Sequence, residues 1–200
     1  MLKSLVNNSK TDKNTDHSYL DLYETLLEGK RRTAKNVLEI GIGDFDTKNG
    51  GSIKLWLDYF TNATIYACDL LSINRVMDEV RNNPRAVLHT STDAYLSSFV
   101  NTHLASKKFD VLIDDGAHTI GSMKSFIDLY SPLMTDDGVL IIEDVKTMAW
   151  IDILVAQTPA ALKPYIKVYD LRKIKNRSDD IVFTIDKRIN DGVNSMERPS

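Results

Sequence analysis

Short apolar runs alternate with longer amphipathic segments along most of this 200-residue chain, and this alternation narrows the folds that it can adopt. Brief runs rich in β-branched residues and bounded by turn residues predict seven strands, at residues 36–42, 63–70, 86–91, 110–116, 138–145, 166–171 and 180–186. Apolar residues at helical spacing predict helices around Tyr23, Trp56, Phe126 and Leu154. Strands joined by helices form a mostly parallel sheet with helices on both faces, so the predicted fold class is α/β.

The last two predicted strands should depart from the parallel pattern. Only the polar residues 172–180 separate them, and these residues carry no helical pattern. A parallel crossover needs about a dozen residues or more, so a link this short joins antiparallel neighbours. The sequence therefore predicts a seven-stranded sheet that is mostly parallel and has an antiparallel last strand.

Length and composition predict a single domain over residues 17–189, preceded by a flexible lead-in at 1–16 and followed by a disordered tail at 190–200. No stretch approaches the roughly 20 apolar residues that a membrane span requires. The N-terminus lacks the apolar segment of a secretory signal, and the single Cys68 cannot form an internal disulfide, so a cytoplasmic location is expected. A net charge of -3 gives no general attraction to nucleic acid or to a membrane surface.

A glycine-containing turn follows the first predicted strand. Gly41 and Gly43 let a ligand approach the backbone there, and ligands of open α/β sheets bind outside the carboxyl ends of the strands. A dinucleotide fingerprint would have a third glycine at position 46, where this chain has Asp46. A pyrophosphate is therefore disfavoured in this turn, and a nicotinamide-dependent dehydrogenase with it.

Acidic residues at three strand ends complete this predicted binding region. Glu39 ends the first strand and suits a cationic or hydroxyl-bearing ligand better than a phosphate. Asp69 ends the second strand and can accept hydrogen bonds from both hydroxyls of a ribose, while Asp93 follows the third strand and can meet the base of the same ligand. A tight turn with no ligand is the simpler alternative, but the spacing of Glu39 and Asp69 favours a nucleoside-like ligand.

A second acidic group follows the fourth and fifth predicted strands. Asp114 and Asp115 end one apolar run in the sequence VLIDDGAH, and Glu143 and Asp144 end the next one. Because neighbouring strands lie about 4.8 Å apart, these carboxylates should converge and repel one another unless a cation neutralises them. Oxygen ligands without a nearby cysteine favour Mg²⁺, with Mn²⁺ and Ca²⁺ as alternatives. Asp114 should face the cofactor side, since adjacent residues of a strand point to opposite sides.

Several motifs together resemble one enzyme family. LEIGIG, the CDL at the end of the second strand and the reversed last strand resemble the class I S-adenosylmethionine-dependent methyltransferases, which are Rossmann-like. GGSIKLWLDYFTNATIYACDL and TDKNTDHSYLDLYETLL resemble stretches of the metal-dependent macrolide sugar O-methyltransferases that act on mycinamicin and macrocin. The resemblance runs from about Thr11 to Ile185, nearly the whole chain, although the larger macrolide enzymes carry an additional N-terminal domain.

The resemblance implies an activity and roles for particular residues. It implies an S-adenosyl-L-methionine cofactor and a Mg²⁺ ion held by Asp115, Glu143 and Asp144. The family's proposed general base corresponds to His118. The acceptor would be a sugar hydroxyl of a glycosylated small molecule or glycan, and the assembly state, a homo-oligomer included, stays open. General chemistry agrees with these roles, because a bound cation lowers the pKa of a hydroxyl and a histidine near neutral pKa can take its proton.

Simpler interpretations of the same residues also exist. His118 could be a hydrogen-bonded turn residue, and Asp115 could cap a helix that begins near Thr119. The segment with His17 could pack on the sheet or fold over the methyl donor, where His17 would touch the ligand. A methyltransferase acting on nucleic acid or on another small molecule, and a non-catalytic S-adenosylmethionine-binding protein, are the alternative functions; the acidic balance disfavours nucleic acid.

Overall fold

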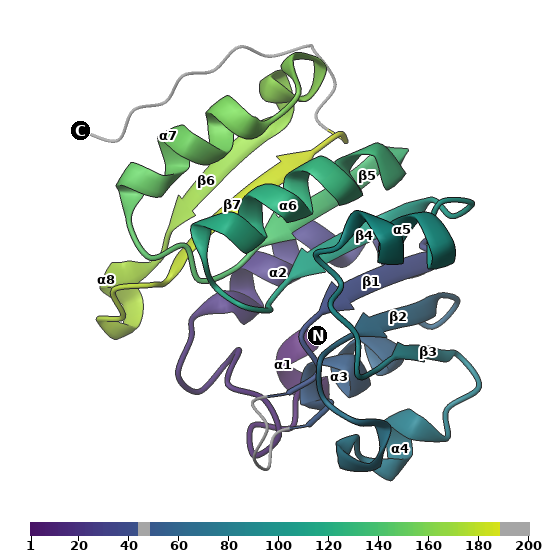
Figure 1. Cartoon of the computed structure of the whole chain (residues 1–200). Coiled ribbons are helices and arrows are strands. Elements are labelled where there is room, and N and C mark those ends of the chain that lie inside the picture. Colours follow the sequence, from purple (N-terminus) through teal and green to yellow (C-terminus); the bar gives the residue numbers. More distant parts are fainter. Residues whose placement is uncertain (44–48, 189–200) are drawn as a thin grey trace.

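The computed structural model describes residues 1–43 and 49–188, and it contains one seven-stranded sheet (Figure 1). The strands are β1 Asn36–Ile40, β2 Thr64–Cys68, β3 Ala86–His89, β4 Phe109–Asp114, β5 Met134–Ile142, β6 Ile166–Asp170 and β7 Ile181–Asp186. Their order across the sheet is β3-β2-β1-β4-β5-β7-β6. The first five strands run parallel, whereas β7 pairs antiparallel with both β5 and β6. The predicted mostly parallel sheet with its antiparallel last strand is confirmed.

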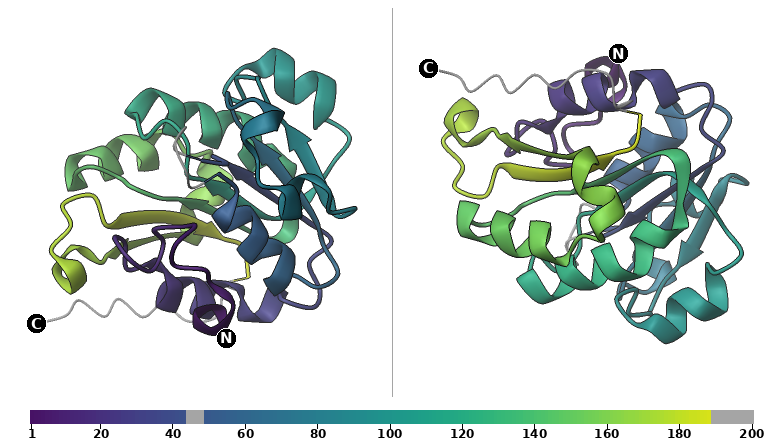
Figure 2. Two further views of the ribbon diagram at one scale, coloured as in Figure 1. Left: turned by 90° about the horizontal axis from the view of Figure 1, so that it is seen from below. Right: turned by 90° about the horizontal axis from the view of Figure 1, so that it is seen from above.

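Helices cover both faces of this sheet (Figure 2). The α-helices are α1 Leu2–Leu5, α2 Tyr19–Leu27, α3 Gly51–Tyr59, α4 Asp78–Arg81, α5 Ser97–His103, α6 Ile120–Tyr130, α7 Met148–Gln157 and α8 Arg172–Lys175. Four short 3-10 helices, at Glu28–Lys30, Ile73–Arg75, Ser131–Leu133 and Ala160–Tyr165, complete the regular elements of the described residues. The link between β6 and β7, which the sequence predicts without a helix, contains the single turn of α8.

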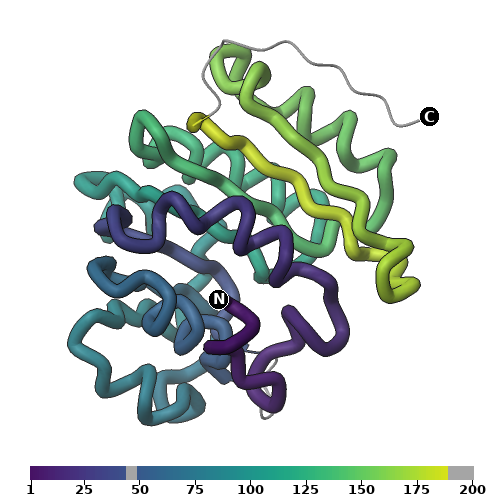
Figure 3. The backbone as a smooth tube through the Cα atoms, turned by 180° about the vertical axis from the view of Figure 1, so that it is seen from behind, coloured from purple at the N-terminus to yellow at the C-terminus, as the bar shows by residue number. Residues whose placement is uncertain are grey.

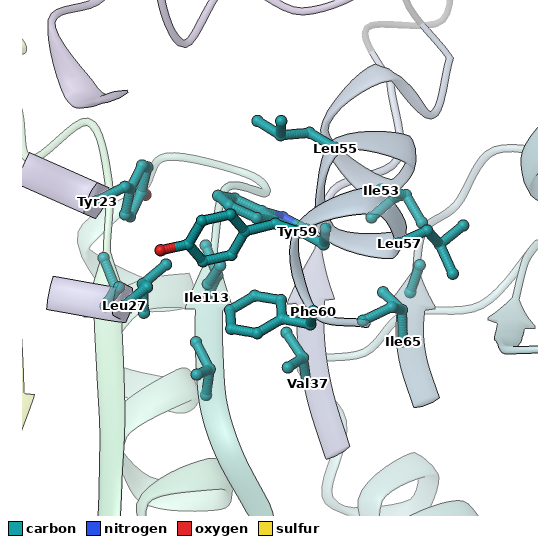
Figure 4. Packing of buried hydrophobic residues seen from close by; sticks show 14 of the residues in the cluster. Tyr23, Leu27, Val37, Ile53, Leu55, Leu57, Tyr59, Phe60, Ile65 and Ile113 are labelled. Atoms are coloured by element: carbon teal, nitrogen blue, oxygen red, sulfur yellow. The ribbon is translucent and has the colours of Figure 1, made fainter. Parts of the chain in front are cut away.

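The helices α2 and α3 pack on one face of the sheet because their apolar residues recur at helical spacing (Figure 4). Tyr23 from α2 meets Trp56 from α3 edge to face, with ring centroids 5.4 Å apart. Below these rings lie inward-facing strand residues such as Val37 and Ile113, which are fully buried. All predicted apolar positions of α2 and α3 belong to this buried set.

The helices α5, α6 and α7 cover the opposite face. The strand residues that alternate with those of the first core, including Leu38 and Leu112, belong to a second core with Phe126 of α6 and Leu154 of α7. Consecutive residues of a central strand thus point into two different cores. The same alternation decides to which side each acidic residue at a strand end points. In the described part of the chain, no helix is both long enough and apolar enough to cross a bilayer.

The segment before the sheet, residues 1–18, folds over one side of the domain (Figure 3). Its helix α1 contacts α2 and α3, and Leu2 is fully buried in the core of that face. Lys13 lies inside the molecule with none of its surface exposed. The predicted flexibility of residues 1–16 stays a prediction, but the segment contributes buried side chains that its polar composition does not suggest. Asp46 and the predicted tail at 190–200 lie outside the described residues.

Candidate active site

The carboxyl ends of β1, β4 and β5 meet at one edge of the sheet, because β4 lies between the other two strands. Ile40 and Ile142 both pair with Asp114 in the strand register. Beyond these pairs, the amide of Asp115 donates to the carbonyl of Ile40 at 2.9 Å, and the amide of Glu143 donates to the carbonyl of Asp114 at 3.0 Å. The backbone therefore brings the two predicted acidic pairs together, as the sequence predicts.

Asp114 points away from its neighbour. The Asp114 carboxylate accepts a hydrogen bond from the Tyr95 hydroxyl, and only 2% of the surface of Asp114 is exposed. Burial raises the pKa of Asp114 to about 6, although the hydrogen bond from Tyr95 opposes this shift. The predicted opposite directions of Asp114 and Asp115 are present, but Asp114 is not among the residues that line the clefts described below. Tyr95 and Asp114 instead hold the loop that follows β4, because the amide of Ala117 in that loop donates to the same Tyr95 hydroxyl.

Lys13 is the cation that the sequence interpretation does not include. Its ammonium lies 2.7 Å from Asp115 Oδ2, 2.7 Å from both carboxylate oxygens of Glu143 and 3.3 Å from Glu39 Oε1. Burial alone would lower the pKa of Lys13, but the charges of Asp115, Glu143 and Glu39 together raise it well above its ordinary value. One buried positive charge from residues 1–18 therefore balances carboxylates from three strands.

Glu39 and Glu143 both point into the face that α2 and α3 cover. The indole of Trp56 donates to Glu39, and the hydroxyl of Tyr23 donates to Glu143. Both glutamates are almost completely buried. Burial raises the pKa of Glu39 to about 7, with the charge of Lys13 acting in the opposite direction. Glu39 is thus held by protein groups instead of facing the cleft that its place in the sequence predicts.

Asp115, His118 and Asp144 form the second group at this edge. The Nε2 of His118 lies 3.2 Å from Asp115 Oδ1 and 3.4 Å from Asp144 Oδ2. Burial alone would raise the pKa of Asp115, but the charge of Lys13 and the hydrogen bond with His118 lower it to about 2. Burial would likewise lower the pKa of His118, and its contacts with Asp115 and Asp144 raise it.

This group offers a place for a divalent cation. One ligand atom from each of Asp115, His118 and Asp144 lies within 4.8 Å of the others, and Asp115 and His118 are still partly accessible. Hard oxygen ligands of this kind suit Mg²⁺ or Ca²⁺. Glu143, the third carboxylate of the predicted metal site, belongs to neither of the candidate metal groups found among the described residues, because it faces Lys13. Two of the three predicted metal ligands thus fit a shared ion as they stand.

Two adjoining clefts open at this edge. One, of about 180 Å³, is lined by Thr11 and Asp12 of the lead-in segment together with Asp115, His118 and Asp144. The other, of about 330 Å³, is lined by residues that include Cys68, Asp69, Asp93 and Tyr95. Both clefts share four residues of the two facing loops: Gly41, Gly43, Asp115 and Gly116. A ligand lying in the larger cleft could therefore present one end to the group around His118.

Gly41 sets the distance between the two loops. Its φ of 108° lies in the region that favours glycine, and a Cβ at this position would collide with the carbonyl of Asp115. The turn is further held by Asp69, whose Oδ2 accepts hydrogen bonds from the amides of Ile42 at 2.6 Å and Gly43 at 3.2 Å. Asp69 and Asp93 line the larger cleft as the sequence predicts, and Asp69 also fixes the glycine turn.

His17 lies deeper than the sequence interpretation places it. It is 5% exposed, its Nδ1 lies 2.6 Å from Asp180 Oδ1 and 3.3 Å from Asp144 Oδ1, and its ring stacks on Tyr19. Neither cleft includes His17 among its lining residues. In this arrangement His17 supports Asp144 from behind and does not reach a ligand in the cleft.

Sequence reasoning missed several polar partners of the site, among them Lys13, Tyr23 and Tyr95. Tyr23 was expected to pack on the sheet, which it does, but its hydroxyl also donates to Glu143. A signal for Lys13 did exist, because several converging carboxylates require a positive charge, and TDKNTDH supplies a lysine in the segment expected to fold near the ligand.

Comparisons with known proteins show which enzymes the chain is similar to. The chain is 29% identical over 136 residues to L-olivosyl-oleandolide 3-O-methyltransferase of Streptomyces antibioticus, a match that covers 67% of the chain and 34% of the relative. It is 28% identical over 136 residues to mycinamicin VI 2''-O-methyltransferase of Micromonospora griseorubida, covering 67% of the chain and 33% of the relative. The matched region thus spans about a third of the length of these curated relatives. No protein-family model matches the chain.

Solved structures extend the likeness to nearly the whole chain. The methyltransferase MycE of the mycinamycin biosynthetic pathway, solved in complex with Mg, SAH and mycinamycin VI, superposes with a TM-score of 0.71 at 20% identity, covering 98% of this chain and 57% of that one. The chain has the class I methyltransferase fold and resembles the macrolide sugar O-methyltransferases. Spermidine synthase of Thermotoga maritima shares this methyltransferase fold more distantly, with a TM-score of 0.55 at 18% identity, 84% of this chain and 59% of that one being covered. The fold prediction and the resemblance are both confirmed, whereas the fold alone does not decide the reaction.

Proposed function

We propose that this chain forms the catalytic domain of an S-adenosyl-L-methionine-dependent O-methyltransferase that acts on a sugar hydroxyl of a glycosylated small molecule. One observation carries the proposal: the group Asp115, His118 and Asp144 borders a cleft that adjoins the cleft lined by Asp69 and Asp93 and shares loop residues with it. A nucleoside-like donor and a hydroxyl acceptor could meet at that junction. The curated relatives, all named as O-methyltransferases, support the same reaction.

The larger cleft is the proposed site of the methyl donor. Asp69 and Asp93 offer carboxylate oxygens at two neighbouring strand ends, and Gly41 and Gly43 let the ligand approach the backbone. At the described part of the glycine turn, Asp69 already accepts the amides of Ile42 and Gly43, so these two amides are not available to a pyrophosphate. A sulfonium nucleoside without phosphates suits this chemistry.

His118 is the proposed general base. In the reaction, the acceptor oxygen attacks the methyl carbon, the bond from that carbon to sulfur breaks, and the hydroxyl proton moves to the His118 imidazole. Asp115 and Asp144 lie beside the ring at Nε2 and position it at the cleft. The site's partial burial limits the access of competing water.

A divalent ion at Asp115 and Asp144 is part of the proposal, with Mg²⁺ favoured by the oxygen ligands and by the named complex of the structural relative. Such an ion, when bound, would lower the pKa of an acceptor hydroxyl and orient it. The chain's own carboxylates would hold the ion next to His118. Glu143, the remaining ligand that the sequence predicts, faces Lys13.

The test is methyl transfer from labelled S-adenosylmethionine to a panel of glycosylated macrolides and polyketides, with an aglycone panel as the control. We expect transfer to the glycosylated compounds only, loss of transfer in excess chelator, and recovery with added Mg²⁺. Transfer that continues unchanged in chelator would remove the ion from the mechanism. Transfer to nucleic acid instead of sugar would replace the proposed acceptor.

A further inference from the structure

Lys13 has every hydrogen of its ammonium group assigned to a carboxylate oxygen. An ammonium has three donors, and Nζ has three hydrogen-bonding partners at 2.7 Å: Asp115 Oδ2, Glu143 Oε1 and Glu143 Oε2. Glu39 Oε1 lies 3.3 Å from Nζ and forms an ion pair with it, but it accepts no hydrogen bond. Lys13 and Glu143 are each almost fully enclosed, with side chains only 1% exposed. The cation is thus built into the site and is not a surface lysine that happens to approach it.

The contacts of Glu143 leave it no free oxygen toward the cleft. Both of its oxygens face Lys13, and Tyr23 donates to one of them from α2. A metal ion could reach Glu143 only by displacing one of these donors. Asp115 differs, because Lys13 takes its Oδ2 while its Oδ1 faces His118 and the cleft. Asp144 also keeps one oxygen, Oδ2, on the His118 side.

We propose that Lys13 is a positioning residue whose ammonium group fixes Asp115 and Glu143 and keeps Glu143 from binding a metal ion. A divalent ion is then held by Asp115 and Asp144. This inference rests on the ion site of the proposed function and changes its composition. Glu39 and Glu143 then face the lysine alone, whereas Asp115 contacts the lysine through Oδ2 and keeps Oδ1 for the ion. The charge of Lys13 also weakens the attraction of the site for a second cation.

The same contacts tie the lead-in segment to the reacting end of the sheet. Lys13 holds it from inside, and Lys175 of α8 holds it from outside by donating to the carbonyls of Asn14, Thr15 and His17. Lys175 touches backbone oxygens of the segment, whereas Lys13 touches carboxylates of the site. The two lysines therefore offer a matched pair of substitutions. Replacing Lys13 changes the charge of the site, whereas replacing Lys175 changes only the attachment of the segment.

The experiment measures Mn²⁺ binding to the full chain by the loss of the free Mn²⁺ electron paramagnetic resonance signal, with Mn²⁺ replacing Mg²⁺. In Lys13→Met the loss of a positive charge beside Asp115 should tighten Mn²⁺ binding roughly tenfold. Lys175→Met should leave the affinity unchanged. A merely structural role of Lys13 predicts the opposite sign, since a loosened segment would let Asp115 and Asp144 separate and would weaken binding.

The outcomes separate this inference from the proposed function. Mn²⁺ binding by the wild type, with tighter binding by Lys13→Met, supports the inference. Binding by Lys13→Met alone would overturn it, because the ion would then not be held while Lys13 is present. Equal affinity in Lys13→Met and wild type would overturn the inference and leave the proposed ion site standing. If neither protein bound Mn²⁺, both would fail.

A second pair of variants keeps the inference testable if Lys13→Met does not fold. Asp144→Asn removes a proposed ligand and should weaken Mn²⁺ binding by at least roughly a hundredfold, more than the usual cost of losing an outer partner of a metal site. Glu143→Gln removes a nearby negative charge but no proposed ligand, so its affinity should fall only about tenfold, far less than that of Asp144→Asn. A loss in Glu143→Gln as large as that in Asp144→Asn would make Glu143 a ligand and contradict the proposal.

Discussion

Two residues of the site, His118 and Asp144, have left-handed backbone conformations, with φ of 48° and 54°. Such angles are uncommon for residues other than glycine and cost on the order of 1–3 kcal/mol each. Of the four such residues among those described, these two are the pair whose side chains meet, 3.4 Å apart. The surrounding contacts of Asp115 and Tyr19 hold them there. Strain that brings two polar side chains together at a cleft supports a catalytic role for this pair.

His118→Asn tests the proposed base without adding a new backbone conflict, because asparagine tolerates the left-handed conformation. The change removes the proton acceptor and should lower the rate of methyl transfer by about 10²–10⁴-fold, the usual contribution of a general base. Binding of S-adenosylmethionine, measured by calorimetry, should stay the same. His89→Asn, at a histidine outside both clefts, is the matched control and should keep full activity. Full activity in His118→Asn would refute the assignment.

Gly41→Ala tests the close approach of the two loops. Its φ of 108° and the nearby carbonyl of Asp115 leave no room for a methyl group, so the free energy of unfolding should fall by at least about 2 kcal/mol. Gly121→Ala is the control, because Gly121 lies in α6 with space around it and should gain about 0.5 kcal/mol. Urea unfolding of both variants measures the difference. Equal stability of the two would show that the loops separate easily.

At the scale of elements, the strand ends were predictable because each apolar run stops at a turn residue. Asp69, Asp93, Asp115 and Asp144 therefore lie near the clefts as predicted. Alternation predicts that adjacent carboxylates at a strand end point to opposite faces, but it does not reveal which side chains of each face will hold them. Asp114 meets Tyr95 on one face and Glu39 meets Trp56 on the other, so both lie behind the cleft.

Helix α6 begins directly after His118 and shows which residue caps it. The sequence left open whether Asp115 does so, but the cap is Thr119, whose hydroxyl accepts from the amide of Ser122 at 3.1 Å while the Ser122 hydroxyl accepts from the amide of Thr119 at 3.1 Å. Asp115 is thereby left to contact Lys13 and His118.

Thr119→Ala removes this cap and should lower the free energy of unfolding by about 1 kcal/mol. Thr119→Ser keeps a hydroxyl at the same place and should restore most of the stability. Thermal or urea unfolding measures both variants. Because His118 immediately precedes the cap, the alanine variant should also bind the acceptor less tightly, and no loss of stability would mean that water replaces the cap.

At the scale of the whole molecule, the site is assembled from segments far apart in the sequence. Lys13, Glu39, Asp115 and Glu143 come from the lead-in segment and three strands, and their contact depends on how the lead-in segment folds back across the sheet (Figure 3). Residues 7–16, which include Lys13, are all polar and carry no apolar pattern that would indicate this path. The buried lysine could therefore be expected from charge balance, but its position could not be derived from local sequence patterns.

A ligand that binds only the folded chain raises the melting temperature, and this property tests the donor cleft in the intact molecule. At about 100 times its dissociation constant, S-adenosylmethionine should stabilise the fold by about 2.7 kcal/mol, which for a domain of this size is a rise of roughly 5–10 °C. NAD⁺ is the matched control, because Asp69 already accepts two amides of the glycine turn, those of Ile42 and Gly43, which a pyrophosphate could otherwise use. A shift with NAD⁺ and none with S-adenosylmethionine would assign the cleft to a dinucleotide.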